Sequence, residues 1–66
     1  MITEETKIQD CDLSIRTKKL FEKIEFETVA DILKQQPCDL LKYRGFGRQS
    51  LKEVLHFVNT NGFFFN

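Results

Sequence analysis

Lys42-Tyr43-Arg44-Gly45-Phe46-Gly47-Arg48-Gln49-Ser50-Leu51 is the stretch that decides the fold of this 66-residue chain. Two glycines around an apolar residue allow a tight reversal, through positive φ or close backbone approach at Gly47, while Phe46 turns inward as an anchor. A helical pattern follows at once, so bare backbone amides open the next helix, with the positive end of its dipole behind them. The spacing predicts the hairpin of a helix-hairpin-helix, in which Arg48 and these amides favour an anion such as a nucleic-acid phosphate.

Helical signals surround this hairpin on both sides. Four helices are expected, over residues 15–24, 29–36, 37–43 and 48–58. Ser14 and Thr28 are suitable caps for the first two, and Pro37 suits the first turn of the third. No alternating apolar run survives five residues, so no strands are expected. The chain is therefore predicted to be all-α. The hairpin has a plain alternative, because a Gly-x-Gly between helices is also found as a simple turn.

Apolar side chains recur at helical spacing and mark the expected core. The positions assigned to it are Leu20, Phe21, Ile24, Leu51, Leu55 and Val58. Cys38 is expected to be buried as well, because thiols are among the most buried side chains. Three successive phenylalanines stand at positions 63–65, of which at least one should dock on the core while some stay exposed.

Size and charge indicate one small domain with an acidic end. Sixty-six residues lie near the lower limit at which a single core folds without a staple. The chain is neutral overall, but Lys7 is outnumbered by four acidic residues within residues 1–12, which leaves −3 there and +3 on residues 13–66. Residues 1–12 show no apolar period, so we expect a flexible acidic arm or linker followed by one helical domain over residues 13–66.

The residues offer no support for several classes of function. Cys11 and Cys38 form no CxxC pair and have only His56 as a possible imidazole partner, so we expect no metal site and no cofactor. A disulfide between the two cysteines is formally possible, but we expect reduced thiols because the sequence shows no apolar segment of the secretory kind. No apolar run approaches the roughly 20 residues of a membrane span, so a cytoplasmic protein without a membrane partner is expected. A paired nucleophile and a phosphate loop are missing, so the chain is not expected to be an enzyme with a small-molecule substrate.

The order of these motifs resembles the carboxy-terminal domain of the bacterial RNA polymerase α subunit. The matching segments are Leu13-Ser14-Ile15-Arg16, Val29-Ala30-Asp31-Ile32-Leu33, Leu40-Leu41-Lys42 and Gly45-Phe46-Gly47-Arg48-Gln49-Ser50-Leu51-Lys52-Glu53-Val54. The resemblance implies a compact domain of four to five helices with a helix-hairpin-helix in a SAM-like arrangement. It also implies a non-catalytic transcription module that contacts A+T-rich promoter DNA through the minor groove, and transcription factors or RNA polymerase components through other faces.

The resemblance carries a DNA-binding site onto this sequence. That site comprises Arg16, Lys19, Gly45, Gly47, Arg48, Gln49, Ser50 and Glu53. Arg16 matches the arginine that the family inserts into a narrow minor groove, where negative potential is concentrated. The family usually has Asn in place of Lys19 and Gly45, and Lys in place of Gln49. The change at Gln49 removes one phosphate contact, whereas Lys19 adds a charge one helical turn from Arg16.

Two functional hypotheses follow, and they belong to different classes. The first is DNA binding, supported by the hairpin and by a row of cations at Arg16, Lys19 and Lys23. The alternative is a protein-protein interaction module of the same fold without significant DNA binding, since a charge row is often only a solvated helix edge and exposed phenylalanines mark partner surfaces. Added salt weakens phosphate binding steeply and leaves an apolar interface largely unchanged, so salt dependence separates the two.

Overall fold

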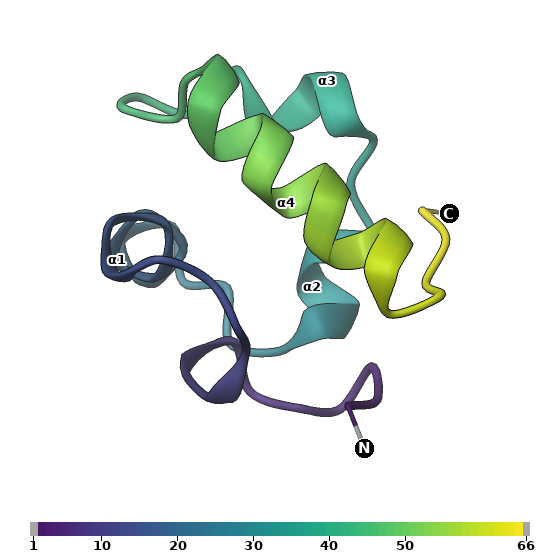
Figure 1. The fold of residues 1–66 in the computed structure, drawn as a ribbon. Coiled ribbons are helices and arrows are strands. Elements are labelled where there is room, and N and C mark those ends of the chain that lie inside the picture. Colours follow the sequence, from purple (N-terminus) through teal and green to yellow (C-terminus); the bar gives the residue numbers. More distant parts are fainter. Residues whose placement is uncertain (1, 66) are drawn as a thin grey trace.

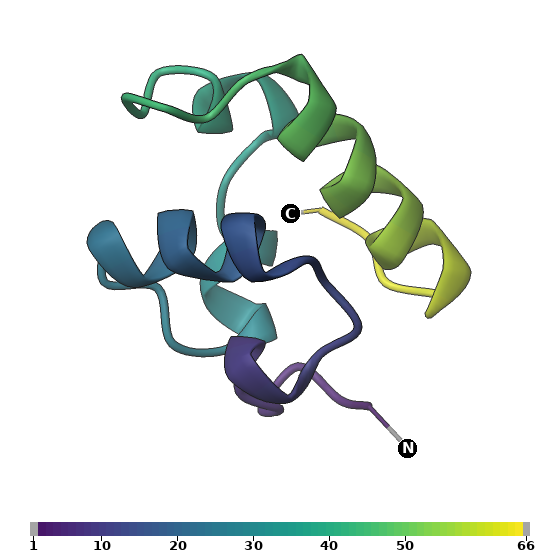
Figure 2. The same cartoon turned by 60° about the vertical axis from the view of Figure 1, so that its left-hand side comes forward.

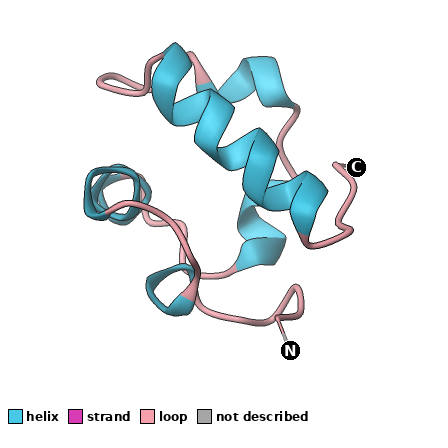
Figure 3. Cartoon of the chain, viewed as in Figure 1, coloured by secondary structure: helices cyan, strands magenta, loops and turns pink. Residues whose placement is uncertain are grey.

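Four α-helices and one short 3-10 helix make up the computed structural model, which describes residues 2–65 (Figure 1). In chain order they are η1 (Ile8–Asp10), α1 (Ile15–Lys23), α2 (Val29–Leu33), α3 (Pro37–Leu40) and α4 (Arg48–Thr60). Over residues 2–65 there is no strand, only an isolated antiparallel bridge between Lys7 and Thr28 (Figure 3). The predicted all-α class is therefore confirmed, while the helix-hairpin-helix assignment stays a prediction.

The helices surround the core in an arrangement that sets α1 opposite α4. In both views α3 and the loop that follows it lie at one end of the molecule, and η1 lies at the other (Figures 1 and 2). Between these ends α1 and α4 form the two sides, and α2 lies between them near the η1 end. The loop of residues 41–47 thus lies beside α1, although residues 24–40 separate the two in sequence.

Side-chain caps begin the first two helices as the sequence predicts. The Ser14 hydroxyl accepts the backbone N–H of Thr17 at 3.3 Å and opens α1. At α2 the Asp31 carboxylate accepts the backbone N–H of Thr28 at 3.2 Å, which completes a capping box. The same carboxylate accepts the backbone N–H of Glu27 at 2.9 Å, and the two bonds hold the pKa of Asp31 below its ordinary value.

Helices α2 and α3 end earlier than predicted, and both end in tighter turns. After α2 the backbone N–H of Gln35 bonds to the carbonyl of Ile32 at 3.1 Å, and Gln36 is extended because it precedes a proline. After α3 successive bonds of the same short type continue to Tyr43, whose N–H bonds to the carbonyl of Leu40 at 3.2 Å. The apolar pattern of a sequence does not distinguish an α-helical turn from a tighter turn that follows it. The predicted helices therefore include these turns and are too long.

Three aromatic rings join the hairpin region to the rest of the core. The buried hydrophobic residues are Ile8, Cys11, Leu13, Phe21, Val29, Ile32, Leu33, Leu40, Phe46, Val54, Phe57 and Val58. Phe21 is fully buried, and its ring centroid lies 5.5 Å from that of Phe46 and 5.7 Å from that of Phe26. The inward anchor predicted at Phe46 is confirmed, and it attaches the loop before α4 to the last turn of α1.

The inward face of α4 differs from the predicted stripe. Leu55 is 39% exposed, and Phe57, at 4%, is buried together with Val54 and Val58. The expectation for Leu55 is wrong because the core contacts the face that Val54, Phe57 and Val58 share, which is rotated away from Leu55. Of the terminal phenylalanines, Phe63 packs against Phe57 with centroids 6.3 Å apart and Phe64 is exposed, as expected.

Residues 2–12 belong to the packed structure, in contrast to the expected arm over residues 1–12. Ile8 and Cys11 are buried in the core, and the Ile8 N–H bonds to the Glu27 carbonyl at 2.8 Å. The N–H groups of Val29 and Ala30 likewise bond to carbonyls of residues 6 and 4, at 3.0 and 2.8 Å. The packed core therefore continues across residue 13, where a domain boundary was expected. Met1 and Asn66, the outer ends of the predicted arm and domain, lie outside the described residues.

Candidate nucleic-acid interface

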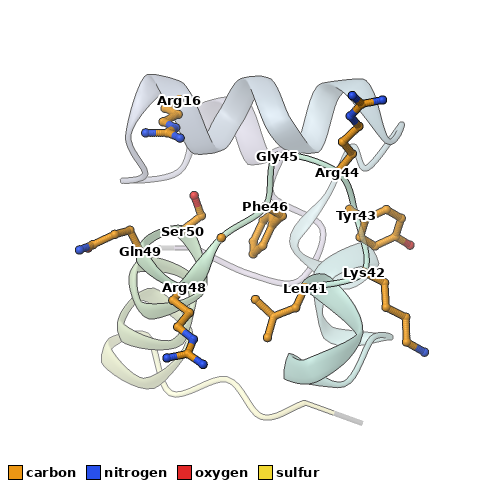
Figure 4. Close-up of a pocket in the computed structure, with 11 residues that line it drawn as sticks. Arg16, Leu41, Lys42, Tyr43, Arg44, Gly45, Phe46, Arg48, Gln49 and Ser50 are labelled. Carbon is orange, nitrogen blue, oxygen red and sulfur yellow. The ribbon is translucent and has the colours of Figure 1, made fainter.

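An open hollow of about 600 Å³ lies where the loop between α3 and α4 faces the start of α1 (Figure 4). It is lined by residues 41–50 together with Arg16 of α1. Four of the lining residues are cations, namely Arg16, Lys42, Arg44 and Arg48. The described residues that line the hollow include no Asp or Glu. This part of a neutral protein is therefore a concentrated positive region, which attracts anions.

Six of the eight predicted site residues line this hollow. They are Arg16, Gly45, Gly47, Arg48, Gln49 and Ser50. Lys19 is exposed on α1 but does not line the hollow, and Glu53 is turned to a different partner. Lys42 and Arg44 also line the hollow, although the predicted site did not include them. Their positive charges, next to the glycines of the predicted hairpin, were the sequence signal that could have identified them.

Glycine is required at Gly45 and not, as predicted, at Gly47. Gly45 has φ +87°, and a Cβ atom there would lie 3.2 Å from Cδ2 of Leu20. Gly47 is extended, at φ −103° and ψ −175°, and a Cβ atom there would meet nothing within 4 Å. The expectation for Gly47 is wrong because the backbone reverses two residues earlier, where the loop touches α1.

The start of α4 has backbone donors and no side-chain cap. Gly47 is the N-cap residue and has no side chain to accept an N–H, while its carbonyl accepts the N–H of Leu51 at 3.0 Å. Residues 48–50, whose amides belong to the first turn, line the hollow. Figure 4 shows the Ser50 hydroxyl pointing toward α1, on the side of Arg16. An anion in this hollow meets amide donors, a hydroxyl and the positive end of a 13-residue helix.

Glu53 fastens α4 to the beginning of α1. Its Oε2 accepts the backbone N–H of Ser14 at 2.8 Å, across 39 positions of sequence. Burial disfavours the charged carboxylate, but hydrogen bonds from the Ser14 N–H and from the Ser14 and Thr17 hydroxyls outweigh it and lower the pKa of Glu53 below its ordinary 4.5. The structure thus gives this predicted site residue a positioning role: it holds the start of α1, and with it Arg16, next to α4.

Replacing Glu53 by glutamine should flatten the dependence of stability on pH. Because its folded-state pKa is lowered, Glu53 adds stability above its unfolded-state pKa, and this stability is lost as the pH falls through the folded-state pKa. Melting temperatures measured between about pH 6 and pH 3 should therefore fall less in Glu53→Gln than in the wild type, with the curves converging at the acidic end. Glu22→Gln, the same change at an exposed residue of α1, should keep the wild-type slope of melting temperature against pH. Equal slopes in all three proteins would show that Glu53 does not stabilise the contact between α4 and the start of α1.

The cysteines and acidic residues show no arrangement that suits a metal. Cys11 and Cys38 are both free thiols; Cys11 is buried, which raises its thiol pKa, and Cys38 is exposed, contrary to expectation. Within residues 2–65 no group of three or more His, Cys, Asp or Glu side chains is placed to hold a metal ion. None of the helices described there is both long and apolar enough to cross a membrane.

Comparisons with known proteins find matches in one family. A family model for the C terminal domain of the bacterial RNA polymerase alpha chain matches residues 2–60. Similar proteins include the DNA-directed RNA polymerase subunit alpha of Phocaeicola vulgatus, 41% identical over 49 residues, and that of Chlorobium phaeobacteroides, 39% identical over 49 residues; each alignment covers 74% of this sequence and 15% of the relative. The subunit of Carboxydothermus hydrogenoformans is 33% identical over 58 residues, covering 88% of this sequence and 18% of the relative. The aligned segments thus span less than a fifth of the length of these relatives.

Proposed function

This protein belongs to the family of the C-terminal domain of the bacterial RNA polymerase alpha subunit, and on that premise we propose that it binds A+T-rich promoter DNA through the minor groove and the phosphate backbone. Family membership makes it a transcription module. The binding activity is our proposal, and one observation carries it: Arg16 and the uncapped start of α4 line the same acid-free hollow. We propose that it acts in the cytoplasm beside other polymerase components, without a catalytic role or a cofactor.

The geometry divides the work between two kinds of contact. Backbone amides at the start of α4 and the Ser50 hydroxyl would hold a phosphate, because helix N-termini supply oriented donors to anions. Arg16 would enter the neighbouring minor groove, which is narrow in A+T-rich DNA and concentrates negative potential there. Phosphate contacts supply affinity for any duplex, whereas the arginine in the groove supplies the preference for A+T-rich sequence.

Protein contact is the second candidate function, and two exposed apolar side chains favour it. Phe64 is 83% exposed and Ile15 is 74% exposed, so both side chains are accessible to a partner protein. We propose that such residues meet transcription factors or polymerase components. In the alternative hypothesis these contacts are the whole function, and the domain binds no DNA.

A titration of the isolated protein with short duplexes tests the proposal. NMR spectra of the backbone amides, recorded with A+T-rich and G+C-rich duplexes at several salt concentrations, should show shifts at residues 44–50 and around Arg16, larger for the A+T-rich duplex. Affinity should fall steeply as salt rises, because each phosphate contact releases counterions. Binding that is absent even at low salt and millimolar concentration would reject the DNA-binding proposal in favour of the protein-interaction module.

Gln49→Lys should tighten DNA binding. Gln49 is exposed, lines the hollow and stands where the family usually has lysine, so the variant adds one cation to the proposed phosphate site. One added contact should steepen the slope of log K against log salt by about 0.9. Salt titrations of both proteins measure this directly, with Gln35→Lys as the control for an added charge outside the hollow. An unchanged slope would mean that residue 49 does not contact DNA.

A further inference from the structure

We infer that Arg44 is a second anchor for nucleic-acid phosphate, separate from the contacts at the start of α4. The inference rests on the proposed function and adds a residue that lies outside the predicted site. Arg44 is exposed and lines the hollow, and it immediately precedes the glycine whose positive φ reverses the backbone. In Figure 4, Arg16 and Arg44 lie on opposite sides of the hollow, and Arg48 lies on a third side.

The charge of Arg44 is available to a ligand. The other unpredicted cation, Lys42, forms a salt bridge of 3.2 Å with Asp39, so its charge is partly matched. Within the described part of the protein, no salt bridge or side-chain hydrogen bond engages Arg16, Arg44 or Arg48. Three unpaired arginines therefore surround one hollow that has no carboxylate in its lining.

The backbone on both sides of Arg44 is held in place. The preceding Tyr43 packs edge-on against Phe26 with ring centroids 5.9 Å apart. Two residues after Arg44, Phe46 is buried against Phe21, and its N–H bonds to the carbonyl of Tyr43 at 3.1 Å, closing the turn. A side chain presented on an anchored turn loses less freedom on binding than one on a loose loop, so more of its contact energy remains as affinity.

A nucleic-acid backbone suits this spread of charge better than a single small anion does. Arginine binds phosphate with a planar pair of N–H groups, and arginines on separate sides of the hollow can take different phosphates of one strand. Arg44 and the start of α4 would then fix the strand at two points, which sets the direction in which Arg16 meets the groove.

Arg44→Ala tests this role by salt titration with an A+T-rich duplex. Losing one phosphate contact should make the slope of log K against log salt shallower by about 0.9, so the affinity deficit of the variant should shrink about 3.5-fold between roughly 50 and 200 mM salt. Arg44→Lys keeps the charge and should keep the wild-type slope. Lys34→Ala, which removes an exposed cation at the end of α2 outside the hollow, is the matched control and should also keep it.

The possible outcomes separate this inference from the proposed function. A wild-type slope in Arg44→Ala, in a protein whose wild type binds DNA, would overturn the anchor and leave the DNA-binding proposal standing. Equal losses in Arg44→Ala and Lys34→Ala would overturn it as well, since they would reflect net charge only. Absence of salt-sensitive binding by the wild type would instead reject the proposed function itself. Melting temperatures of all variants should match the wild type, because both side chains are exposed.

Discussion

Gly45→Val should lower the melting temperature of the domain by roughly 5–20 °C. A valine at φ +87° is held in a backbone conformation that costs about 1–3 kcal/mol, and its Cβ would lie 3.2 Å from Leu20 Cδ2. In a domain of this size each kcal/mol shifts the melting temperature by about 4–8 °C. Either the Leu20 side chain or the loop must shift to relieve the contact, and a shift of the loop would disturb the hollow along with stability. Thermal unfolding followed by circular dichroism measures the effect.

Gly47→Ser is the matched control for that experiment. Gly47 is extended, has open space around its Cα and occupies the N-cap of α4, where serine is at least as favourable as glycine. Its melting temperature should therefore stay at or slightly above that of the wild type. If Gly47→Ser were the more damaging change of the two, the assignment of the reversal to Gly45 would be wrong.

Arg16→Ala should cost roughly 1–3 kcal/mol of DNA binding, a loss of about 5- to 150-fold, and should abolish the preference for A+T-rich duplexes. The preference disappears because the proposed contact in the narrow groove is the one that senses sequence. Folding should be unaffected, since Arg16 is exposed. Affinities for A+T-rich and G+C-rich duplexes, measured at one salt concentration by fluorescence anisotropy, give both quantities.

Lys23→Ala is the control on the same helix. Lys23 is exposed in the last turn of α1 and does not line the hollow, so its loss should weaken binding less and equally for both duplexes. A preference for A+T-rich DNA that survives in Arg16→Ala would show that another residue reads the groove. A change in melting temperature in that variant would instead assign Arg16 a structural role.

Local signals in the sequence were sufficient to predict where the α-helices begin and that Phe46 turns inward. Ser14 and Thr28 cap helices where the sequence places caps, and α4 begins at Arg48 as expected. Phe46 is buried between its two glycines. The caps and the start of α4 depend on residues within about one helical turn, where capping and periodicity act, so neighbouring residues alone are enough to predict them.

Contacts between distant segments decided the rest, and no local pattern reports them. Ile8 and Cys11 are single apolar residues in a polar stretch, and they become core only because that stretch bonds to residues 27–30. Gly45 rather than Gly47 carries the positive φ and lies against Leu20 of α1, and Glu25 adopts φ +63° although its residue type does not predict it. The sequence by itself determined where the α-helices begin and which stretch carries the cations of the loop before α4. Only the tertiary structure placed Arg16 across the hollow from Arg44. Side chains far apart in sequence come together when whole helices pack, and the packing energy belongs to the contacts between segments, so it cannot be read from one segment alone.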